Sequence, residues 1–196
     1  MHISTIFVLE SSWDKENPLS NSSVMPFVSE FAKQRGIKAY YQVFTDTKSF
    51  CHWINEFNKV ATSSSLLYIA SHGNKGSLIP LNGGIKRGSI ISALAKAKNI
   101  KFVHFGSCLF GNRENLLLIL KKCKHFQWAA GYNKSVDWIN SMLFDILLWG
   151  RITTREDHER SKKTQTIVKD IAENQAAGMV ADLGFEYAYR YGTSIF

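Results

Sequence analysis

Apolar runs with the character of β-strands alternate with segments of helical spacing along residues 4–149. Alternation with short linkers favours right-handed βαβ units, so the sequence predicts a three-layer α/β fold with a mostly parallel sheet and helices on both faces. The strand runs are almost continuously apolar, as expected for strands buried on both faces. The predicted strands span residues 4–10, 37–44, 66–70, 101–107 and 126–131. The predicted helices span residues 23–36, 46–61, 89–99, 114–124 and 135–149.

The pattern changes after Gly150. Residues 151–163 are highly polar and predict a loop or an exposed helix, and the alternating segment 185–192 predicts an edge strand. Residues 164–184 predict a helix between them. Apolar residues of this helix are expected to face inward at Ile167, Ile171 and Val180. In the preceding predicted helix, apolar residues recur at helical intervals at Val136, Ile139, Leu143, Ile146 and Leu147.

The length of 196 residues suits one domain. We expect a single domain over residues 1–196, with its core in 3–150 and a C-terminal helix and edge strand in 151–196. The three cysteines are too few and too scattered for a disulfide framework, and they form no C-x-x-C pair or zinc-binding spacing. No metal or other cofactor is therefore expected. Cys51 and Cys123 fall on apolar faces of predicted helices, which indicates structural roles.

The N-terminus lacks the pattern of a signal peptide, and the longest apolar run is far shorter than a membrane span. We therefore expect a reduced, cytoplasmic protein that does not interact with a membrane. The formal net charge of +8 permits a polyanionic partner. However, the basic residues are dispersed through helical patterns, without a dense block interleaved with aromatic residues. Nucleic acid is therefore not the expected partner.

Two predicted strands end in residues with catalytic chemistry. The strand 66–70 leads into Ser71-His72-Gly73, and the next strand leads into Ser107-Cys108. One predicted helix joins the two strands, which favours neighbours about 4.8 Å apart with both carboxyl ends at one edge of the sheet. An unperturbed thiol is largely protonated at neutral pH, and a nearby imidazole can accept its proton. The N–H groups of Gly73 and Cys108 are candidates for an oxyanion hole.

Residues 66–73 and 102–108 together resemble the caspase-like (clan CD) cysteine peptidases. In both, an apolar strand ends in His-Gly, a helix follows, and a second apolar strand ends in a small residue and Cys. The segment G-S-C-L-F-G lacks the Q-A-C-x-G signature of caspases, and the interval from His72 to Cys108 is shorter than their ~50 residues. The motifs are closest in style to CHAT and separase-type bacterial domains. Residues 128–138 are also similar to these domains, because an aromatic residue, a slightly longer loop and Asp137 follow the fifth strand.

This resemblance implies a caspase-like, flavodoxin-related topology and a cysteine endopeptidase that needs no cofactor. Cys108 would attack the scissile carbonyl, and His72 would serve as general base and then as general acid. Asp137 would favour Lys or Arg at P1, and Asp14 and Ser12, which follow the first strand, would contribute to the P1 pocket. The implied partners are a protein substrate and a separate activator protein or signal molecule. Small bacterial relatives also imply an effector role in antiphage defence.

Structural interpretations exist for the same residues. Cys108 is also compatible with a position in the core, and His72 is compatible with a structural role in a turn. Asp137 is compatible with the first turn of a helix, where a carboxylate interacts favourably with the helix dipole. His104 lies within a predicted strand, so we expect it to be a hydrogen-bonded histidine of the core. The glycine-rich residues 82–88 predict a turn or short hairpin. Two other functions remain open at this point. One is a catalytically inactive, caspase-like binding module, and the other is a Cys/His amidase that acts on a small molecule.

Overall fold

The computed structural model describes residues 3–14, 16–17, 22–153 and 164–196. The strands are β1 (Thr5–Glu10), β2 (Lys38–Val43), β3 (Ser65–Ala70), β4 (His72–Asn74), β5 (Ser77–Ile79), β6 (Ile85–Lys86), β7 (Phe102–Gly106), β8 (Trp128–Tyr132), β9 (Phe185–Tyr191) and β10 (Ser194–Ile195). The helices are α1 (Met25–Arg35), α2 (Thr47–Val60), α3 (Arg87–Leu94), α4 (Arg113–Lys122), α5 (Trp138–Thr153), α6 (Thr164–Asp170) and α7 (Ala177–Leu183), with a π-helical turn at Ile171–Gln175 between the last two.

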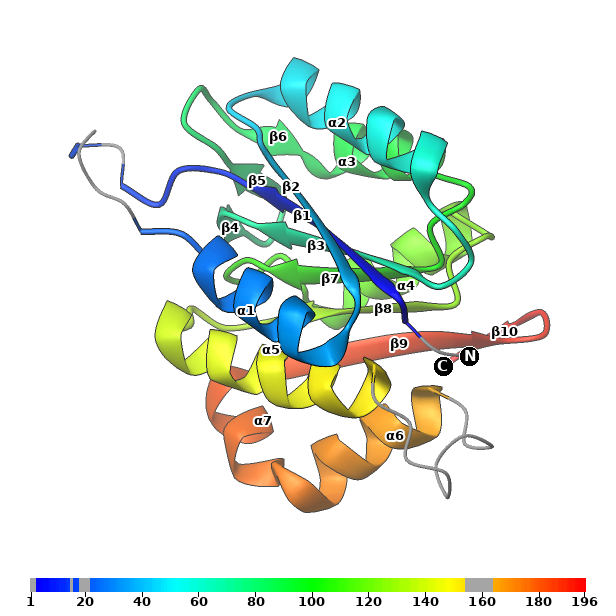
Figure 1. Cartoon of the computed structure of the whole chain (residues 1–196). Helices are drawn as coiled ribbons and strands as arrows, with labels where there is room; N and C mark the ends of the chain where they lie inside the picture. Colours follow the sequence, from blue (N-terminus) through cyan, green and yellow to red (C-terminus); the bar gives the residue numbers. More distant parts are fainter. Residues whose placement is uncertain (1–2, 15, 18–21, 154–163) are drawn as a thin grey trace.

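Seven strands form the central sheet in the order β10-β9-β8-β7-β3-β1-β2 (Figure 1). The parallel part of the sheet consists of β2, β1, β3, β7 and β8. Strand β9 pairs antiparallel with β8, and β10 pairs antiparallel with β9. The mostly parallel α/β sheet predicted from the sequence is therefore confirmed. A small antiparallel sheet of β4, β5 and β6 follows β3, and it contains the hairpin predicted at residues 82–88 as its last turn and strand.

Helices cover both faces of the central sheet (Figure 1). A hydrophobic core is buried on each face. Side chains of α2, α3 and α4 pack on one face, and side chains of α1, α5, α6 and α7 pack on the other. The strands β1, β3, β7 and β8 are buried along their whole length, whereas β2 alternates between exposed and half-buried residues as the edge strand. Burial on both faces explains why the central strands are continuously apolar.

Helix boundaries follow from local side-chain chemistry. Asp46 and Ser49 form a reciprocal capping box at the start of α2, and Asn112 accepts the Asn115 N–H at the start of α4. Gly36 ends α1 with φ +63°, a left-handed conformation that glycine adopts without a steric penalty. The Asp137 side chain accepts the Asn140 N–H, so α5 starts later than residue 135, the predicted start.

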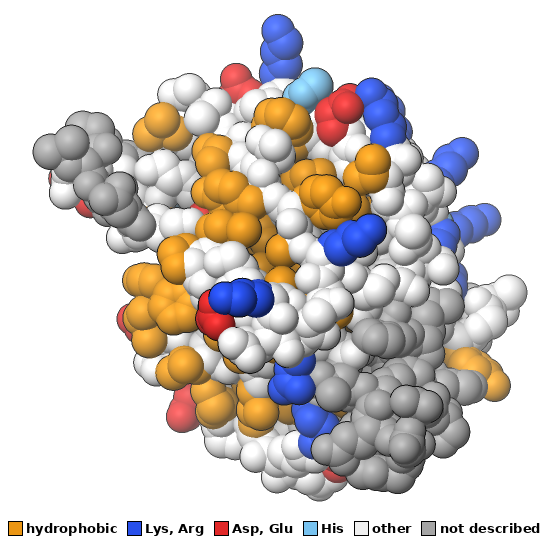
Figure 2. Space-filling view, viewed as in Figure 1, with side chains coloured by type: hydrophobic (Ala, Val, Ile, Leu, Met, Phe, Trp, Pro, Cys, Tyr) orange, Lys and Arg blue, Asp and Glu red, His pale blue; other side chains and the backbone are white. Residues whose placement is uncertain are grey.

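The buried face of α5 is not the face formed by the apolar residues that recur at helical intervals in the sequence. Ile139, Leu143 and Leu147 are 40%, 53% and 39% exposed. The buried face instead carries Met142, Phe144, Asp145, Leu148, Trp149 and Ile152. Apolar side chains are visible on this side of the molecule, over α1 and α5 (Figure 2). Because α5 is apolar around most of its circumference, spacing alone did not identify the face that contacts the sheet.

The C-terminal segment departs from the prediction in two ways. The helix expected over 164–184 is interrupted by the π-helical turn, and Ile167 and Ile171 are buried whereas Val180 is only half-buried. The predicted edge strand, β9, pairs with β8 on one side and with the short β10 on the other. The edge strand on this side of the sheet is therefore β10, and β2 lies at the opposite edge. Within the polar stretch 151–163, α5 continues to Thr153, and residues 154–163 lie outside the described part of the chain.

None of the helices in the described residues is both long enough and apolar enough to cross a membrane.

Candidate functional site

The carboxyl ends of β3 and β7 lie side by side, as the single crossover predicted. The two strands pair in parallel up to Ala70 and Gly106. Ser71 and Ser107 follow them, and both are fully buried. Their hydroxyl oxygens lie 3.4 Å apart, and the Ser107 hydroxyl also donates to the Ile69 carbonyl at 3.4 Å. The side chains of Ser71 and Ser107 therefore link the two strand ends, and each serine immediately precedes a candidate catalytic residue, His72 or Cys108.

Gly73 packs directly against the backbone of the cysteine turn. A Cβ atom at this position would lie 2.7 Å from the Cys108 carbonyl oxygen and 3.3 Å from the Ser107 Cβ. A side chain is therefore excluded unless one of the two segments moves. The hairpin that starts at His72 and the turn that contains Cys108 are thus in contact, although Gly73 and Cys108 are 35 positions apart in the sequence.

His72 is exposed at the start of β4 and is held by the loop that follows β1. Its Nε2 atom lies 2.6 Å from the Trp13 carbonyl oxygen, and the two aromatic rings meet edge to face at 5.5 Å. A carbonyl oxygen can only accept, so Nε2 carries the hydrogen in this contact. In the neutral imidazole, Nδ1 is then the nitrogen that can accept a proton.

Glu10 anchors the loop that positions Trp13. Its side chain is 3% exposed, at the carboxyl end of β1. One carboxylate oxygen accepts from the Trp13 indole N–H at 2.5 Å and the Val24 N–H at 2.8 Å. The other accepts from the Ser23 and Tyr41 hydroxyls at 2.6 and 3.0 Å. Burial, together with the negative charge of Glu10, raises the pKa of Tyr41 to about 12, so its hydroxyl stays protonated and donates.

Cys108 is half-buried in the turn after β7. Its sulfur accepts the Val136 N–H at 3.5 Å, and the Ser135 hydroxyl lies 4.0 Å away. The thiol also lies 3.8 Å from the Val136 carbonyl. Among the described residues, the hydrogen-bond partners of this thiol come from residues 135–136, and no hydrogen bond joins it to His72.

The residue after the cysteine has an unusual backbone conformation. Leu109 has φ +63°, and it is the only non-glycine residue in the described chain with a positive φ. Its N–H donates to the Lys134 carbonyl at 3.0 Å, and its carbonyl accepts from the Asn112 side chain at 2.8 Å. Such conformations are energetically costly and concentrate at functional sites. In the described part of the chain, the Cys108 N–H has no protein acceptor, as an oxyanion-hole donor requires.

The three predicted specificity residues lie in the two loops beside this pair. Asp137 is exposed and caps α5, as the structural interpretation expected, and it directly follows Val136, which contacts the thiol. Asp14 accepts the N–H groups of Glu16 and Asn17, and its carbonyl accepts from the Ser12 hydroxyl. Asp14 and Ser12 flank Trp13, which contacts His72. All three therefore have local structural partners as well as a place beside the site.

The remaining cysteines and His104 lie away from this site. Cys51 is exposed, which corrects its assignment to an apolar helix face, whereas Cys123 is buried and burial raises its pKa to about 11. His104 is fully buried and accepts the Trp149 indole N–H at 3.3 Å, in agreement with the predicted core histidine. In the described ranges, no three His, Cys, Asp or Glu side chains gather in a way that could hold a metal ion.

Sequence reasoning missed the residues that support the pair. No local motif marks these residues. Trp13 and Val136 contact His72 and Cys108 through backbone groups, and Glu10 acts on the site through Trp13. A polar residue at the end of an apolar strand, as at Glu10, was the one available signal. Asn115, which contacts both halves of the site, gave no signal beyond its place near a predicted helix start.

Comparison with known proteins identifies the fold. No protein-family model matches the chain, and no curated protein sequence matches it. The structure is similar to the X-ray structure of a secreted C11 cysteine protease from Bacteroides thetaiotaomicron in complex with an irreversible peptide inhibitor. The TM-score is 0.51 and the sequence identity 11%. The match covers 90% of this chain but only 60% of the protease chain. The chain therefore has an α/β fold similar to that of this cysteine protease, and it spans less than two thirds of the protease chain.

Proposed function

We propose that this protein is a cysteine endopeptidase in which Cys108 is the nucleophile and His72 the general base. The observation that supports this most strongly is the contact between Gly73 and the Cys108 backbone at the ends of two paired strands. The two segments in contact are those that carry the His72 imidazole, the Cys108 thiol and the two candidate oxyanion donors. The fold shared with a cysteine protease that binds a peptide inhibitor gives independent support.

The proposed reaction follows the usual course of acyl transfer. The thiol proton passes to Nδ1 of His72, the sulfur bonds to the scissile carbonyl carbon, and the carbonyl electrons move to oxygen. The N–H groups of Gly73 and Cys108 stabilise this oxyanion. As the oxyanion collapses, the C–N bond breaks and the imidazolium protonates the leaving amine. Water then attacks the thioester, releases the carboxylic acid and restores the thiol.

In this mechanism the support around each group has a defined role. The Trp13 carbonyl fixes the imidazole with Nε2 protonated, and it also stabilises the imidazolium that forms when Nδ1 accepts the thiol proton. In the structure the thiol and the imidazole have other hydrogen-bond partners and are not bonded to one another. Catalytic hydrogen bonds of this kind often shorten only when substrate is bound.

The finer assignments are part of the proposal. Asp137 would bind a Lys or Arg side chain at P1, because its exposed carboxylate directly follows the segment that contacts the thiol, and Asp14 and Ser12 would line the other side. The likeness to CHAT and separase-type domains, a separate activator, a protein substrate and an antiphage role rest on the sequence resemblance alone.

Covalent labelling tests this function. The purified chain is treated with peptide acyloxymethylketones that carry Lys, Arg or Asp at P1, and the modified residue is mapped by mass spectrometry. We expect labelling of Cys108 by the basic probes. Labelling should be absent in Cys108→Ala, reduced at least ~10²-fold in His72→Ala, and reduced for the basic probes in Asp137→Ala. Cys51→Ala, which removes an exposed thiol elsewhere, is the matched control and should label as the unaltered chain does.

Other outcomes point to the alternatives. If Cys108 reacts with small amide-based electrophiles but not with peptides, the Cys/His amidase is the better description. If Cys108 is inert to iodoacetamide while Cys51 reacts, the peptidase proposal is wrong and the inactive binding module replaces it.

A further inference from the structure

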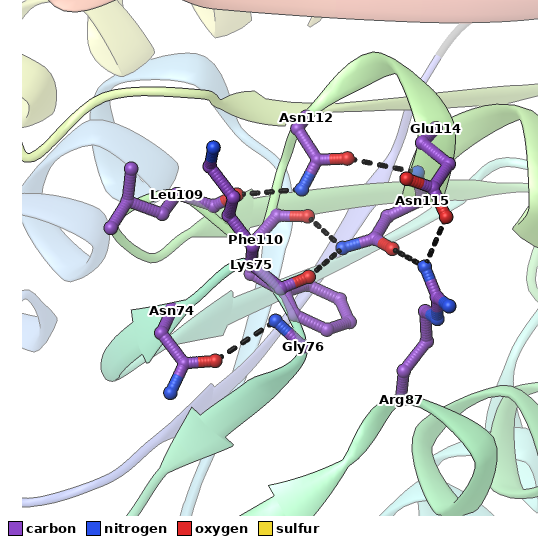
Figure 3. Close-up of polar contacts among 9 residues, drawn as sticks. All are labelled: Asn74, Lys75, Gly76, Arg87, Leu109, Phe110, Asn112, Glu114 and Asn115. Carbon is purple, nitrogen blue, oxygen red and sulfur yellow. Dashed lines mark hydrogen bonds and ion pairs between the residues drawn. The ribbon is translucent and has the colours of Figure 1, made fainter.

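Asn115 is a buried amide that contacts both halves of the candidate site. It lies in the first turn of α4 and is fully buried. Its Nδ2 group donates to the Lys75 carbonyl at 2.9 Å and to the Phe110 carbonyl at 2.8 Å. Its Oδ1 atom accepts from the Arg87 guanidinium at 3.0 Å. All three contacts converge on this one side chain (Figure 3).

The two carbonyls belong to the segments that carry the candidate catalytic groups. Lys75 lies in the turn between β4 and β5, two residues after Gly73, and Phe110 lies two residues after Cys108. One side chain therefore links the histidine hairpin to the cysteine turn, and it does so close to the contact between Gly73 and Cys108. The adjacent Asn112 side chain holds the Leu109 carbonyl of the same turn.

These contacts require an amide. The two N–H bonds satisfy two carbonyls, and the oxygen satisfies a guanidinium, so the side chain needs two donors and one acceptor. Arg87 also fixes the orientation of the amide, because a cation can face only its oxygen. The Arg87 guanidinium also contacts the exposed Glu114 carboxylate at 2.6 Å, outside this buried set of hydrogen bonds. Asp would have the same shape and would retain the Arg87 contact, but it has no hydrogen to offer either carbonyl when ionised.

We propose that Asn115 is a positioning residue that sets the distance between the N–H groups of Gly73 and Cys108, so that both can bind one oxyanion. This inference rests on the proposed peptidase function. It predicts that loss of the two amide donors affects the step in which negative charge develops on oxygen. Substrate binding and the intrinsic reactivity of the thiol should change little.

The experiment compares two reactions of the full chain with Asn115→Asp. Hydrolysis of a fluorogenic peptide with Arg at P1 requires an oxyanion, whereas alkylation of Cys108 by iodoacetamide is a displacement at a saturated carbon and does not. We expect kcat to fall ~10²-fold, the typical effect of losing an oxyanion donor, with KM and the alkylation rate changed less than about threefold. Thermal unfolding of both proteins is measured alongside.

A second pair of variants gives a result even if Asn115→Asp does not fold. Arg87→Met removes the contact that orients the amide, and Glu114→Gln removes only the ion pair partner of Arg87, on a side chain that is 77% exposed. We expect kcat to fall several-fold in Arg87→Met, with an unchanged alkylation rate, and to stay the same in Glu114→Gln.

Three results would overturn the inference. The first is an unchanged kcat in Asn115→Asp. The second is an equal fall of kcat and alkylation rate, which would indicate a general loss of structure. The third is equal activity of Arg87→Met and Glu114→Gln when Asn115→Asp does not fold. Failure of the proposed function looks different, because the unaltered chain then neither hydrolyses the peptide nor reacts with the peptide probe at Cys108.

Discussion

At the scale of single residues, the candidate site depends on close backbone contacts more than on side-chain pairing. The thiol and the imidazole each have a backbone partner, Val136 N–H for Cys108 and the Trp13 carbonyl for His72. The positive φ of Leu109 turns the chain sharply just after Cys108. Gly73 is the residue at which the two segments meet, so it is the most sensitive position for a small change in size.

Replacement of Gly73 by Ala tests this contact. The new Cβ would lie 2.7 Å from the Cys108 carbonyl oxygen, so the hairpin or the turn must shift. A displacement of about 1 Å in a catalytic group typically costs ~10²-fold in rate, and overpacking typically costs about 1–3 kcal/mol of stability. We therefore expect labelling of Cys108 by the peptide probe to slow ~10²-fold while the protein remains folded.

Gly88→Ala is the matched control, because nothing lies within 4 Å of a Cβ at that position in α3. It should leave labelling unchanged and raise the free energy of unfolding by up to ~1 kcal/mol, since Ala favours a helix more than Gly does. Equal labelling rates for the two variants would show that the Gly73 contact is not important for the site.

At the scale of elements, three loops meet around the ends of β3 and β7. They follow β1, β3 and β8, and each is held by a polar side chain or by a small sheet. Glu10 anchors the loop after β1, the β4–β6 sheet stiffens the chain after β3, and Asp137 caps α5 at the end of the loop after β8. The site is therefore assembled from loops, but each loop is fixed at a secondary-structure boundary.

Glu10 gives the clearest prediction at this scale. In Glu10→Ala the Val24 N–H, which is buried, loses its acceptor, and the Trp13 indole and two hydroxyls lose theirs. We expect the free energy of unfolding to fall by about 3 kcal/mol, as measured by urea denaturation. In Glu10→Gln the amide oxygen can still accept from Trp13 and Val24, and the hydroxyls can turn to accept from the amide. The loss should then be at most ~1 kcal/mol.

Equal destabilisation by Ala and Gln would contradict this account, because it would show that the charge of Glu10, and not its hydrogen bonds, holds the loop. The effect on the site is measured in the same proteins by the rate at which the peptide probe labels Cys108, which should fall more in Glu10→Ala.

At the scale of the whole molecule, a buried polar cluster joins α5 to the sheet. Asp145 is fully buried, and it accepts from the hydroxyls of Tyr132 and Tyr68 at 2.5 and 2.7 Å. His104 Nε2 lies 3.1 Å from the same carboxylate. Burial raises the pKa of Asp145 from 3.8 to about 7, partly offset by the two tyrosine hydrogen bonds. Burial also lowers the pKa of His104 to about 3, so this imidazole is neutral at physiological pH.

The raised pKa of Asp145 makes stability depend on pH. Between pH 3.8 and about 7 the folded protein retains a proton on Asp145 that the unfolded chain has lost. The contribution of this group is therefore fully present below pH 3.8, decreases as pH rises, and is lost above about 7. Asp145→Asn cannot titrate. We expect the stability of the unaltered chain relative to this variant to fall by at most ~1.4 kcal/mol per pH unit in this window, and then to level off.

Urea denaturation of both proteins at a series of pH values measures this difference. The buried His104 contributes in the opposite direction, because its folded pKa is lowered, but it is present in both proteins and largely cancels in the comparison. A constant difference in stability from pH about 4 to about 8 would show that Asp145 is already ionised in the folded state throughout this range.

Much of the fold was determined by sequence pattern alone. Continuous apolar runs indicate strands buried on both faces, and one helix between two such runs indicates neighbouring parallel strands, so the pairing of β3 with β7 was predictable. The same rule placed His72, Gly73 and Cys108 at one edge of the sheet. These inferences succeed because strand direction and crossover handedness are set by backbone sterics, which depend little on the rest of the molecule.

Only the tertiary structure decided which groups support that edge. Glu10, Trp13, Val136 and Asn115 contact the site across long stretches of sequence, and two of them do so through backbone atoms that any residue possesses. The buried face of α5 and the interrupted C-terminal helix were likewise decided by packing, because an apolar helix can turn either face toward a sheet. Periodicity reports local geometry, whereas the partner of a buried polar group depends on how the elements come together.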